Sequence, residues 1–401
     1  MITLRTLIKV SPMIQDSRTL MGQSRRVLPL THCIPALVVV LGAVSLLAAD
    51  PLPGTLKLHA VPTPVVSYRL LSMSRDRDGF IWAGSVHQAI HRYNPRSGEV
   101  KSIPLPSKST ASACICAGEK VYVLGQVYPR LIIHNRTTGT FIEKEYPSPK
   151  PDVWYGTEPV GSRWLYLFDR GSAGVIKWDT TTDTGTALPW PYKTPFPSSG
   201  QYEAADNALW CRVWDMTDAQ YIPVGLARLD VVKDEFTGWY PFPDDDAELA
   251  PYSDPNTTFF LPSTLKGKVI PFDFKNRRWC RFHEVPDYGR RFGFLGGATA
   301  HAGRQYFSLS TYNGTNLGCD GQPYHFVNAI LEFDPATARF NFLTLEVPDK
   351  YYQIAYMLSE GGDFFATATN IREASGILNG NRSGDVVFWQ TLKPPPRAEL
   401  P

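Results

Sequence analysis

Tyrosine, tryptophan and arginine recur in pairs where inner strands are expected, and these residue types can bind anionic sugars. Aromatic rings stack on the apolar faces of sugars, and arginine forms bidentate hydrogen bonds with carboxylates or sulfates. If the strands surround one axis, the pairs converge on one entrance. For each residue taken singly, packing between strands or a solvated charge is the alternative. The pairs are Tyr68 and Arg69, Trp154 and Tyr155, Tyr202 and Glu203, Arg290 and Arg291, and Tyr351 and Tyr352.

Two histidines add candidates for acid-base chemistry. His87 falls in a predicted loop, and His325 ends a long one. Imidazole titrates near neutral pH, so either residue can act as a base or bind a metal. In an elimination, a tyrosine or histidine base would remove a proton next to a carboxylate that arginine neutralises. The candidate catalytic residues are Tyr68, His87, Tyr155, Arg291 and Tyr352. The candidate ligand-binding residues are Arg69, Trp154, Tyr202, Glu203, Arg290, Tyr351 and His325.

The sequence carries no standard catalytic or metal-binding motif. HExxH, GxSxG, a phosphate-binding loop and a dinucleotide fingerprint do not occur. The acidic run Asp244–Asp246 with Glu248 is predicted to be a solvated loop rather than a cation site. Cys114 and Cys116 share one face of an apolar strand and are predicted to be buried thiols rather than metal ligands. No metal site or cofactor is assigned, and a requirement for a divalent metal stays open.

Composition indicates an all-β protein. The chain has 401 residues, with 40 basic and 38 acidic side chains and a formal charge of +2, so no global field favours nucleic acid. It has 34 Pro, 31 Gly and 12% aromatic residues, which suit short strands joined by tight turns. The sparse cysteines are no disulfide framework, although one pair can still form among Cys114, Cys116, Cys211, Cys280 and Cys319.

The N-terminus is typical of an exported protein. The apolar run "IPALVVVLGAVSLLAA" at 34–49 follows two arginines, is short for a membrane span, and ends in residues that suit signal-peptidase cleavage. We expect residues 1–49 to be a signal peptide, with Met21 as an alternative start and an uncleaved anchor as the alternative interpretation. The mature domain, 50–401, is then periplasmic or extracellular, without membrane contact.

A phrase of two strands joined by a polar turn recurs along the chain. The spacing, about 40 to 60 residues, is that of four-stranded propeller blades. The six copies read YNPRSGEVKSIPLP, HNRTTGTFIEKEYP, WDTTTDTGTALPWP, LDVVKDEFTGWYPFP, FDFKNRRWCRFHEVP and FDPATARFNFLTLEVP.

A seventh unit is divided between the two ends of the chain. Gly54–Pro64, "GTLKLHAVPTP", has an outer strand alone, whereas the C-terminal phrases "YYQIAYMLSE", "DFFATATN" and "GDVVFWQT" lack one. Pairing the two parts leaves no free sheet edge between the first and last blades. The sequence therefore predicts a single seven-bladed β-propeller domain whose last blade is closed by the N-terminal strand.

The first complete blade can be divided into strands. Asp76–Gly79, "DRDG", is predicted to be the turn between the first two, and a calcium loop is less favoured because its ligand series is incomplete. Trp82 is expected to pack between neighbouring blades. From the axis outward, the predicted strands are Val65–Ser74, Phe80–Ser85, Ala89–Tyr93 and Glu99–Leu105.

Long segments are predicted on one face of the propeller, which is therefore the expected binding face. The opposite face would carry short, regular turns. The long segments are Trp190–Gly200, Asp215–Ile222, Asp244–Thr258, Thr311–Phe326 and Asn370–Gly384.

The stretch Asp78–Pro106, "DGFIWAG" followed by "HRYNPRSGEVKSIPLP", resembles repeats of virginiamycin B lyase-like propellers and of propellers in two-component regulators. The resemblance implies a propeller. In the lyase family it also implies metal-assisted elimination by histidine and glutamate in late blades. No stretch of this chain matches those catalytic residues, so none is carried over, and fold alone does not decide chemistry.

Three functions follow as hypotheses. The leading one is an exported, monomeric propeller that binds a carbohydrate or another small polar ligand on its loop-rich face. The alternative is a lyase that acts on uronate polysaccharide or on a lactone-type substrate. The third is a platform for protein interactions. Whether the protein is an enzyme is left open.

Overall fold

A computed structural model describes parts of the second of two compact units, Met1–Leu46 and Leu47–Pro401. The predicted signal peptide lies outside the described residues. No helix in the described part is long and apolar enough to cross a membrane. The described residues are 59–62, 70–85, 89–106, 111–125, 129–172, 174–192, 196–217, 220–245, 247–252, 257–260, 267–285, 294–309, 329–344, 352–360, 363–370 and 385–390.

The described strands form seven antiparallel four-stranded sheets, numbered here in chain order. Sheet 1 contains β2 (Leu70–Arg75), β3 (Ile81–Ser85), β4 (Ala89–Tyr93) and β5 (Val100–Pro104). Sheet 2 contains β6 (Ala113–Ala117), β7 (Lys120–Leu124), β8 (Arg130–Asn135) and β9 (Phe141–Glu145). Sheet 3 contains β10 (Val153–Gly156), β11 (Trp164–Asp169), β12 (Gly174–Asp179) and β13 (Thr184–Pro189). Sheet 4 contains β14 (Phe196–Glu203), β15 (Ala208–Thr217), β16 (Gln220–Asp230) and β17 (Glu235–Pro241).

The remaining sheets complete the set. Sheet 5 contains β18 (Thr258–Phe260) and β19 (Lys268–Asp273), and β19 pairs with both β20 (Arg278–Trp279) and β21 (His283–Glu284). Sheet 6 contains β22 (Phe294–His301), β23 (Arg304–Leu309), β24 (Ala329–Asp334) and β25 (Arg339–Thr344). Sheet 7 contains β26 (Tyr352–Glu360), β27 (Asp363–Asn370), β28 (Asp385–Gln390) and β1 (His59–Pro62).

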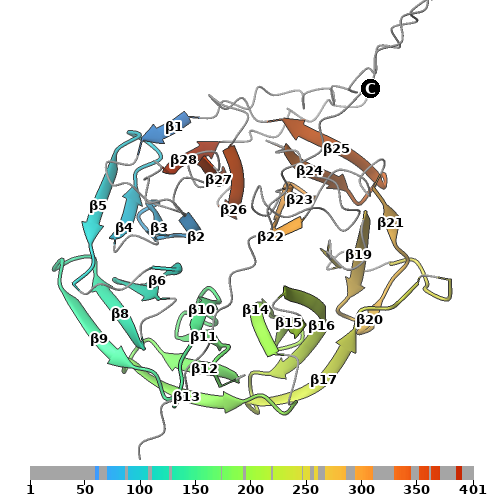
Figure 1. The fold of residues 1–401 in the computed structure, drawn as a ribbon, viewed down its shortest axis with the longest axis horizontal. Coiled ribbons are helices and arrows are strands. Elements are labelled where there is room, and N and C mark those ends of the chain that lie inside the picture. The colour runs from blue at the N-terminus through green and yellow to red at the C-terminus, as the bar shows by residue number, and fades with distance from the viewer. Residues whose placement is uncertain are drawn as a thin grey trace, which may run out of the picture. The chain divides into compact units, whose positions relative to one another are not determined.

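The sheets follow one another around a ring, and β2, β6, β10, β14, β22 and β26 lie nearest the axis (Figure 1). β26 of sheet 7 contacts β2 of sheet 1 and β22 of sheet 6. The predicted strand order of the first repeat is confirmed, because β2 to β5 pair in that order, and β3 to β5 lie within one residue of their predicted bounds. β2 ends one residue beyond the predicted Ser74, and residues 65–69 of the predicted first strand lie outside the described part. β1 pairs antiparallel with β28, with His59 opposite Trp389 and Pro62 opposite Val386.

The hydrophobic core lies between neighbouring sheets. In β15, Leu209 and Cys211 pack with sheet 3, whereas Trp210 packs with sheet 5 against Phe272. This alternation follows from the two-residue period of a strand, which sends successive side chains to opposite faces. Trp82 is likewise buried against sheet 2, as predicted.

In six sheets, an Asn or Asp at or directly after the end of a strand caps the turn that follows, which explains the recurring sequence phrase. In sheet 2, for example, Asn135 Oδ1 accepts hydrogen bonds from the backbone N–H groups of Thr137 and Thr138, at 2.9 and 3.0 Å. Such side chains satisfy turn donors that would otherwise lack partners. The capping residues are Asn94, Asn135, Asp179, Asp230, Asp273 and Asp334.

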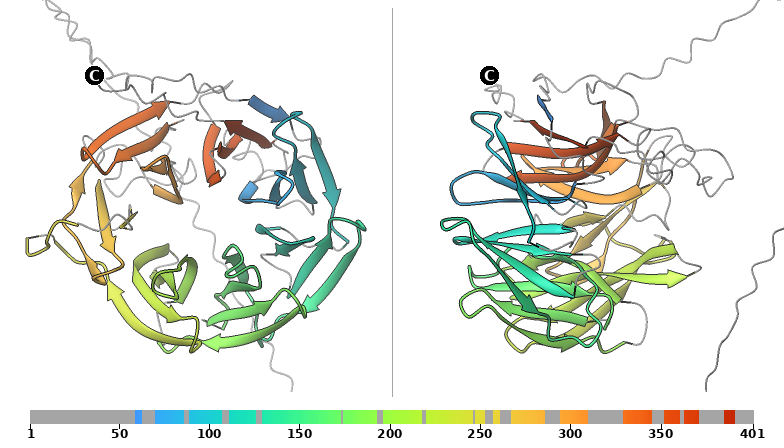
Figure 2. Two further views of the ribbon diagram at one scale, coloured as in Figure 1. Left: turned by 180° about the vertical axis from the view of Figure 1, so that it is seen from behind. Right: turned by 60° about the vertical axis from the view of Figure 1, so that its left-hand side comes forward.

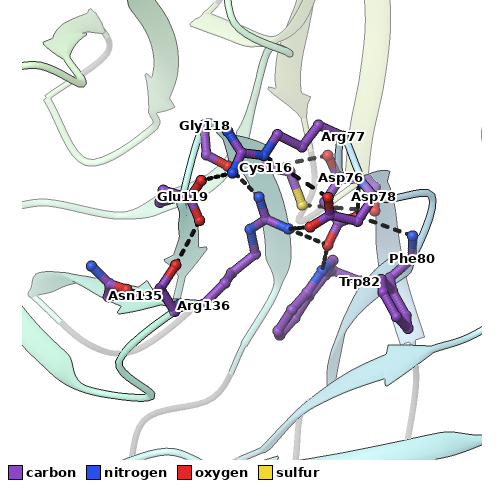
Figure 3. A network of polar contacts seen from close by, with 12 residues as sticks. Asp76, Arg77, Asp78, Phe80, Trp82, Cys116, Gly118, Glu119, Asn135 and Arg136 are labelled. Atoms are coloured by element: carbon purple, nitrogen blue, oxygen red, sulfur yellow. Dashed lines mark hydrogen bonds and ion pairs between the residues drawn. The ribbon is translucent and has the colours of Figure 1, made fainter.

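Asp76 joins its own turn to sheet 2 (Figure 3). One carboxylate oxygen accepts hydrogen bonds from the backbone N–H groups of Asp78 and Phe80, each at 3.0 Å. The other accepts from Trp82 Nε1 at 2.8 Å and from Arg136 at 2.6 Å. The side chains of Asp76 and Arg136 are only 1% and 6% exposed. The interpretation of this stretch as a stabilised turn is confirmed.

Two predicted loops are wrong in part. Residues 196–200 belong to β14, and 215–217 and 220–222 belong to β15 and β16, which pair out to Thr217 opposite Gln220. A bulge between Val213 and Trp214 shifts the register without ending the pairing. The resulting hairpin is longer than its neighbours, with strands of 10 and 11 residues, and a yellow-green strand projects from the ring in Figure 2.

The other predicted loops are only partly described. Residues 244–245 and 247–252 lie in irregular structure, and Thr258 begins β18. Asn370 ends β27. Residues 311–326 and 371–384 lie outside the described part.

We expect Asp76→Ala to lower the free energy of unfolding by about 3 to 5 kcal/mol, because it leaves the buried Arg136 without its principal partner. Urea unfolding followed by tryptophan fluorescence measures the change. Asp78→Ala is the matched control, since its side chain is 56% exposed, and should cost less than about 1 kcal/mol. Equal losses in the two variants would contradict the role given to Asp76.

The buried His91 predicts acid sensitivity. Its Nδ1 lies 2.9 Å from Ser102 Oγ, and burial lowers the pKa of His91 from 6.5 to about 4. The unfolded chain therefore takes up this proton first, and stability falls as pH drops from about 6.5 to about 4, by up to about 3 kcal/mol. Urea unfolding across this range should show a shallower loss for His91→Gln than for the natural protein. Parallel pH profiles would exclude this contribution.

Candidate ligand-binding site

Several predicted site residues lie outside the described part. Tyr352 is the first residue of β26, paired with Asn370. The positions outside are Tyr68, Arg69, His87, Arg290, Arg291, His325 and Tyr351.

Trp154 takes part in packing between sheets 3 and 4. Its indole N–H donates to Asp152. The guanidinium carbon of Arg170 lies 4.3 Å from the Trp154 ring and 5.6 Å from the ring of Phe196, the first residue of β14. A cation between two aromatic rings links the elements that carry them. In the described part, Trp154 thus has a structural role of its own.

Tyr202 and Glu203 serve a turn. They are the last two residues of β14, although we expected them at the common entrance of the ring. The Tyr202 hydroxyl donates to Asn207 Oδ1 at 3.2 Å, and Glu203 Oε1 accepts from the backbone N–H of Ala205 at 3.3 Å. Both interactions stabilise the connection from β14 to β15.

A second group of side chains interacts across the inner strands, and we call it the central polar cluster. Its members come from β2, β6, β10, the segment after β10, β15 and β26. In Figure 1, β2, β6, β10 and β26 are innermost strands of the ring. The members are Ser74, Cys116, Tyr155, Glu158, Arg212 and Tyr356.

Ser74 joins three elements of the cluster. Its buried hydroxyl accepts a hydrogen bond from the backbone N–H of Cys116 at 3.0 Å and donates to Glu158 Oε2 at 3.1 Å. Two residues earlier, Ser72 Oγ accepts from the backbone N–H of Cys114 at 2.9 Å. The two serines tie β2 to β6, and Ser74 also holds the exposed Glu158 carboxylate.

Arg212 is a partly buried cation with an aromatic ring beside it. Its guanidinium carbon lies 5.2 Å from the Phe260 ring centre. Burial lowers the pKa of Arg212, but arginine stays protonated at neutral pH. Within the described residues, Arg212 has neither a hydrogen bond nor an ion pair through its side chain. The buried Arg228, by contrast, binds Asp206 at 2.7 Å and approaches Asp230 at 3.7 Å.

The titratable side chains around Arg212 are largely uncharged. The pKa of Tyr356 is raised to about 12, mainly by burial and then by electrostatic interactions with Glu158 and Tyr155. Arg212 acts in the opposite direction and lowers this pKa. Burial and the charge of Glu158 also raise the pKa of Cys116. At neutral pH the Tyr356 phenol is therefore a hydrogen-bond donor and the thiol is unreactive. Arg212 and Glu158 supply one positive and one negative charge.

Sequence reasoning found Tyr155 but missed the other members. Arg212 had a usable signal, because it lies in the apolar strand "ALWCRVW", where a charge is unusual. Glu158 and Tyr356 had none, since their partners come from distant repeats. Ser74 and Glu158, for example, form their hydrogen bond only because the sheets surround one axis.

The predictions about cysteine and acidic residues can be compared with the structure. Cys114 and Cys116 are buried free thiols on one face of β6, as predicted. Cys319 lies outside the described part. Asp244, Asp245 and Glu248 are exposed, in agreement with a solvated loop, and Asp246 lies outside the described part. In the described part, no group of three His, Cys, Asp or Glu side chains is placed to hold a metal ion.

Comparison with known proteins identifies the fold. No protein-family model and no curated protein matches the sequence. Among solved structures, virginiamycin B lyase from Staphylococcus aureus matches with a TM-score of 0.61 and 14% identity, covering 84% of this chain and all of the lyase. A streptogramin B lyase matches with a TM-score of 0.60 and 13% identity, over 84% of this chain and 98% of that one.

A third similar structure is YCF48 bound to D1 peptide, with a TM-score of 0.59 and 11% identity, over 86% of this chain and all of that one. The resemblance to lyase-like propellers stated from the sequence is confirmed for the fold. This fold is a β-propeller. At these identities the likeness concerns the fold and not the chemistry.

Arg212, which has no charged partner among the described residues, predicts an unusual response to mutation. We expect Arg212→Met to raise the free energy of unfolding by about 1 to 4 kcal/mol, because it replaces a desolvated charge with an apolar chain. Arg228→Met, at a buried arginine with carboxylate partners, should lower it by about 3 to 5 kcal/mol. Urea unfolding of both variants without ligand gives the comparison. A loss of stability in Arg212→Met comparable to that in Arg228→Met would show that Arg212 is structural.

Proposed function

We propose that this chain is an exported, seven-bladed β-propeller that binds a small polar ligand at the central polar cluster. The apolar run before residue 50 supports export. The seven four-stranded sheets and the pairing of β1 with β28 support seven blades closed by the N-terminal strand. The domain would then be residues 50–401, acting as a monomer in the periplasm or outside the cell.

Arg212 is the observation on which the binding function rests. A cation that is largely removed from water costs free energy unless an anion or hydrogen-bond acceptors satisfy it. Residues that destabilise a protein yet are retained are typical of functional sites. A ligand with an anionic group would supply the acceptors that the described chain does not.

The surroundings of Arg212 favour a carbohydrate-like ligand. The Phe260 ring beside the guanidinium offers an apolar surface, and the phenol of Tyr356 offers a donor. Flat rings with a few placed polar groups are typical of sites for small polar molecules. This proposal moves the ligand from the loop-rich face, where the sequence placed it, toward the centre of the ring.

Binding is better supported than an elimination in which Tyr356 is the base. A base must be deprotonated near the working pH, and the raised pKa of Tyr356 keeps this residue protonated. The similar lyases contribute the fold at 13 to 14% identity. Lyase activity is therefore an outcome to be tested: unsaturated product from a polyuronate, seen by ultraviolet absorbance, would replace binding with catalysis.

The test is calorimetric titration of the purified full-length protein with a panel of neutral sugars, sugar acids and amino acids. We expect at least one to bind, and Tyr155→Phe to weaken it about 5- to 10-fold through loss of one hydroxyl hydrogen bond. Tyr192→Phe is the control, because Tyr192 is 38% exposed and lies outside the cluster. Absence of binding across the panel, or equal weakening in both variants, would contradict the site.

A further inference from the structure

We propose that Arg92 and Lys101, on the two outer strands of sheet 1, form a binding site for a tetrahedral oxyanion with two negative charges, such as phosphate or sulfate. The site is separate from the central polar cluster and does not depend on the proposed function. It follows from the register of sheet 1 and from a comparison with equivalent positions in other sheets.

Arg92 and Lys101 lie on the same face of sheet 1. Arg92 on β4 pairs with Trp82 of β3 on one side and with Lys101 of β5 on the other. Paired residues of antiparallel strands project from the same face, with Cβ atoms about 4.5 to 5.5 Å apart. Trp82 is buried against sheet 2, so both cations are on the face toward that sheet. Lys101 is exposed and Arg92 is partly exposed.

Aromatic rings hold the Arg92 guanidinium in place. Its central carbon lies 4.6 Å from the ring centre of Phe80 and 6.0 Å from that of Trp82. Stacking on a ring uses a face of the guanidinium and leaves the N–H groups at its edge for an acceptor. Arg92 is therefore a positioned cation rather than a freely rotating one.

Neither cation has a carboxylate partner among the described residues. Glu143 of β9 is on the facing side of sheet 2, because it pairs with Ile132, which is buried against sheet 1. Its carboxylate lies 3.3 Å from Arg130. Like charges directly opposite each other in a sheet are destabilising. The pair of Arg92 and Lys101 therefore lowers stability unless an anion neutralises it.

The repeat provides a comparison for Arg92, which lies two residues before the turn-capping Asn94. In three other described sheets a charged residue lies two positions before the capping Asp, and an oppositely charged side chain binds it. Each of these residues pairs with an uncharged residue of the outer strand. Arg92 differs in both respects. The equivalent ion pairs are Lys177 with Asp234 at 2.7 Å, Arg228 with Asp206 at 2.7 Å, and Glu332 with Arg304 at 3.0 Å.

The two cations suit a tetrahedral dianion. One such anion neutralises both charges, whereas a monoanion leaves one of them. The guanidinium donates through a planar fork, and the ammonium is a point charge with three donors. A phosphate or sulfate group has oxygens in several directions and can accept from both. Protection of a sheet edge would explain Lys101 but not Arg92, which lies on the third strand.

The test is urea unfolding of the purified full-length protein at about pH 8, where phosphate is mainly a dianion. Phosphate, sulfate or acetate is added to sodium chloride at constant ionic strength. A Kd of about 5 mM would raise the folding equilibrium constant about 5-fold at about 20 mM phosphate or sulfate. Acetate, a monoanion, should raise it less than about 2-fold.

Three variants assign the effect to the site. In chloride alone, Lys101→Gln should be more stable than the natural protein, because it removes the repulsion. In phosphate or sulfate, both Lys101→Gln and Arg92→Gln should lose the gain. Lys144→Gln is the matched control and should keep it. Lys144 is also on an outer strand, β9, but it pairs with Leu131, which is buried against sheet 3.

Each result decides the inference. Equal gains in the natural protein and in Lys101→Gln, or an equal gain from acetate, would show a general salt effect and overturn it. Lower stability of Lys101→Gln in chloride would also overturn it, because the repulsion would then be absent. Calorimetric titration identifies the source of the anion: tighter binding of glycerol 3-phosphate than of inorganic phosphate supports a phosphate ester as ligand, and the reverse supports the free anion.

Discussion

Each sheet of the ring has two apolar faces, and only its neighbours can bury them. Trp82 of sheet 1, Trp178 of sheet 3 and Trp210 of sheet 4 are all buried in clusters formed between adjacent sheets. A four-stranded sheet with both faces in water would not be stable, so every sheet depends on the two beside it. The same dependence makes sheet 7, assembled from both ends of the described chain, essential to sheets 1 and 6.

Polar contacts fix the arrangement that packing allows. Arg136 reaches Asp76 from sheet 2 to sheet 1, Lys177 of sheet 3 reaches Asp234 at 2.7 Å, and Arg277 of sheet 5 reaches Asp206 at 2.8 Å. Hydrophobic burial is non-directional, whereas these charge-assisted bonds require a defined geometry. The ring can therefore hold inner side chains from several sheets in fixed positions, which a ligand site needs.

Arg212 differs from several paired charges in the described part. Asp76, Asp179, Asp206 and Glu332 each have a cationic partner from the chain. Arg212 occupies a comparable interface, beside Phe260, without one among the described residues. A scaffold held together by many paired charges can tolerate the cost of a charge without such a partner.

The sequence alone determined the repeat, and with it the strand order, the capped turns and the burial of Trp82, Cys114 and Cys116. These features depend on residue type and on spacings of a few positions, which local physics controls. The tertiary structure decided the length of the β15–β16 hairpin and which side chains, such as Phe260, lie beside Arg212. The register shifts by a bulge after Val213, and the two strands stay paired to Thr217, beyond Asp215, where a loop was predicted to begin. Ser74 and Glu158 are far apart along the chain and form a hydrogen bond only because the sheets surround one axis, a long-range constraint that no local pattern encodes.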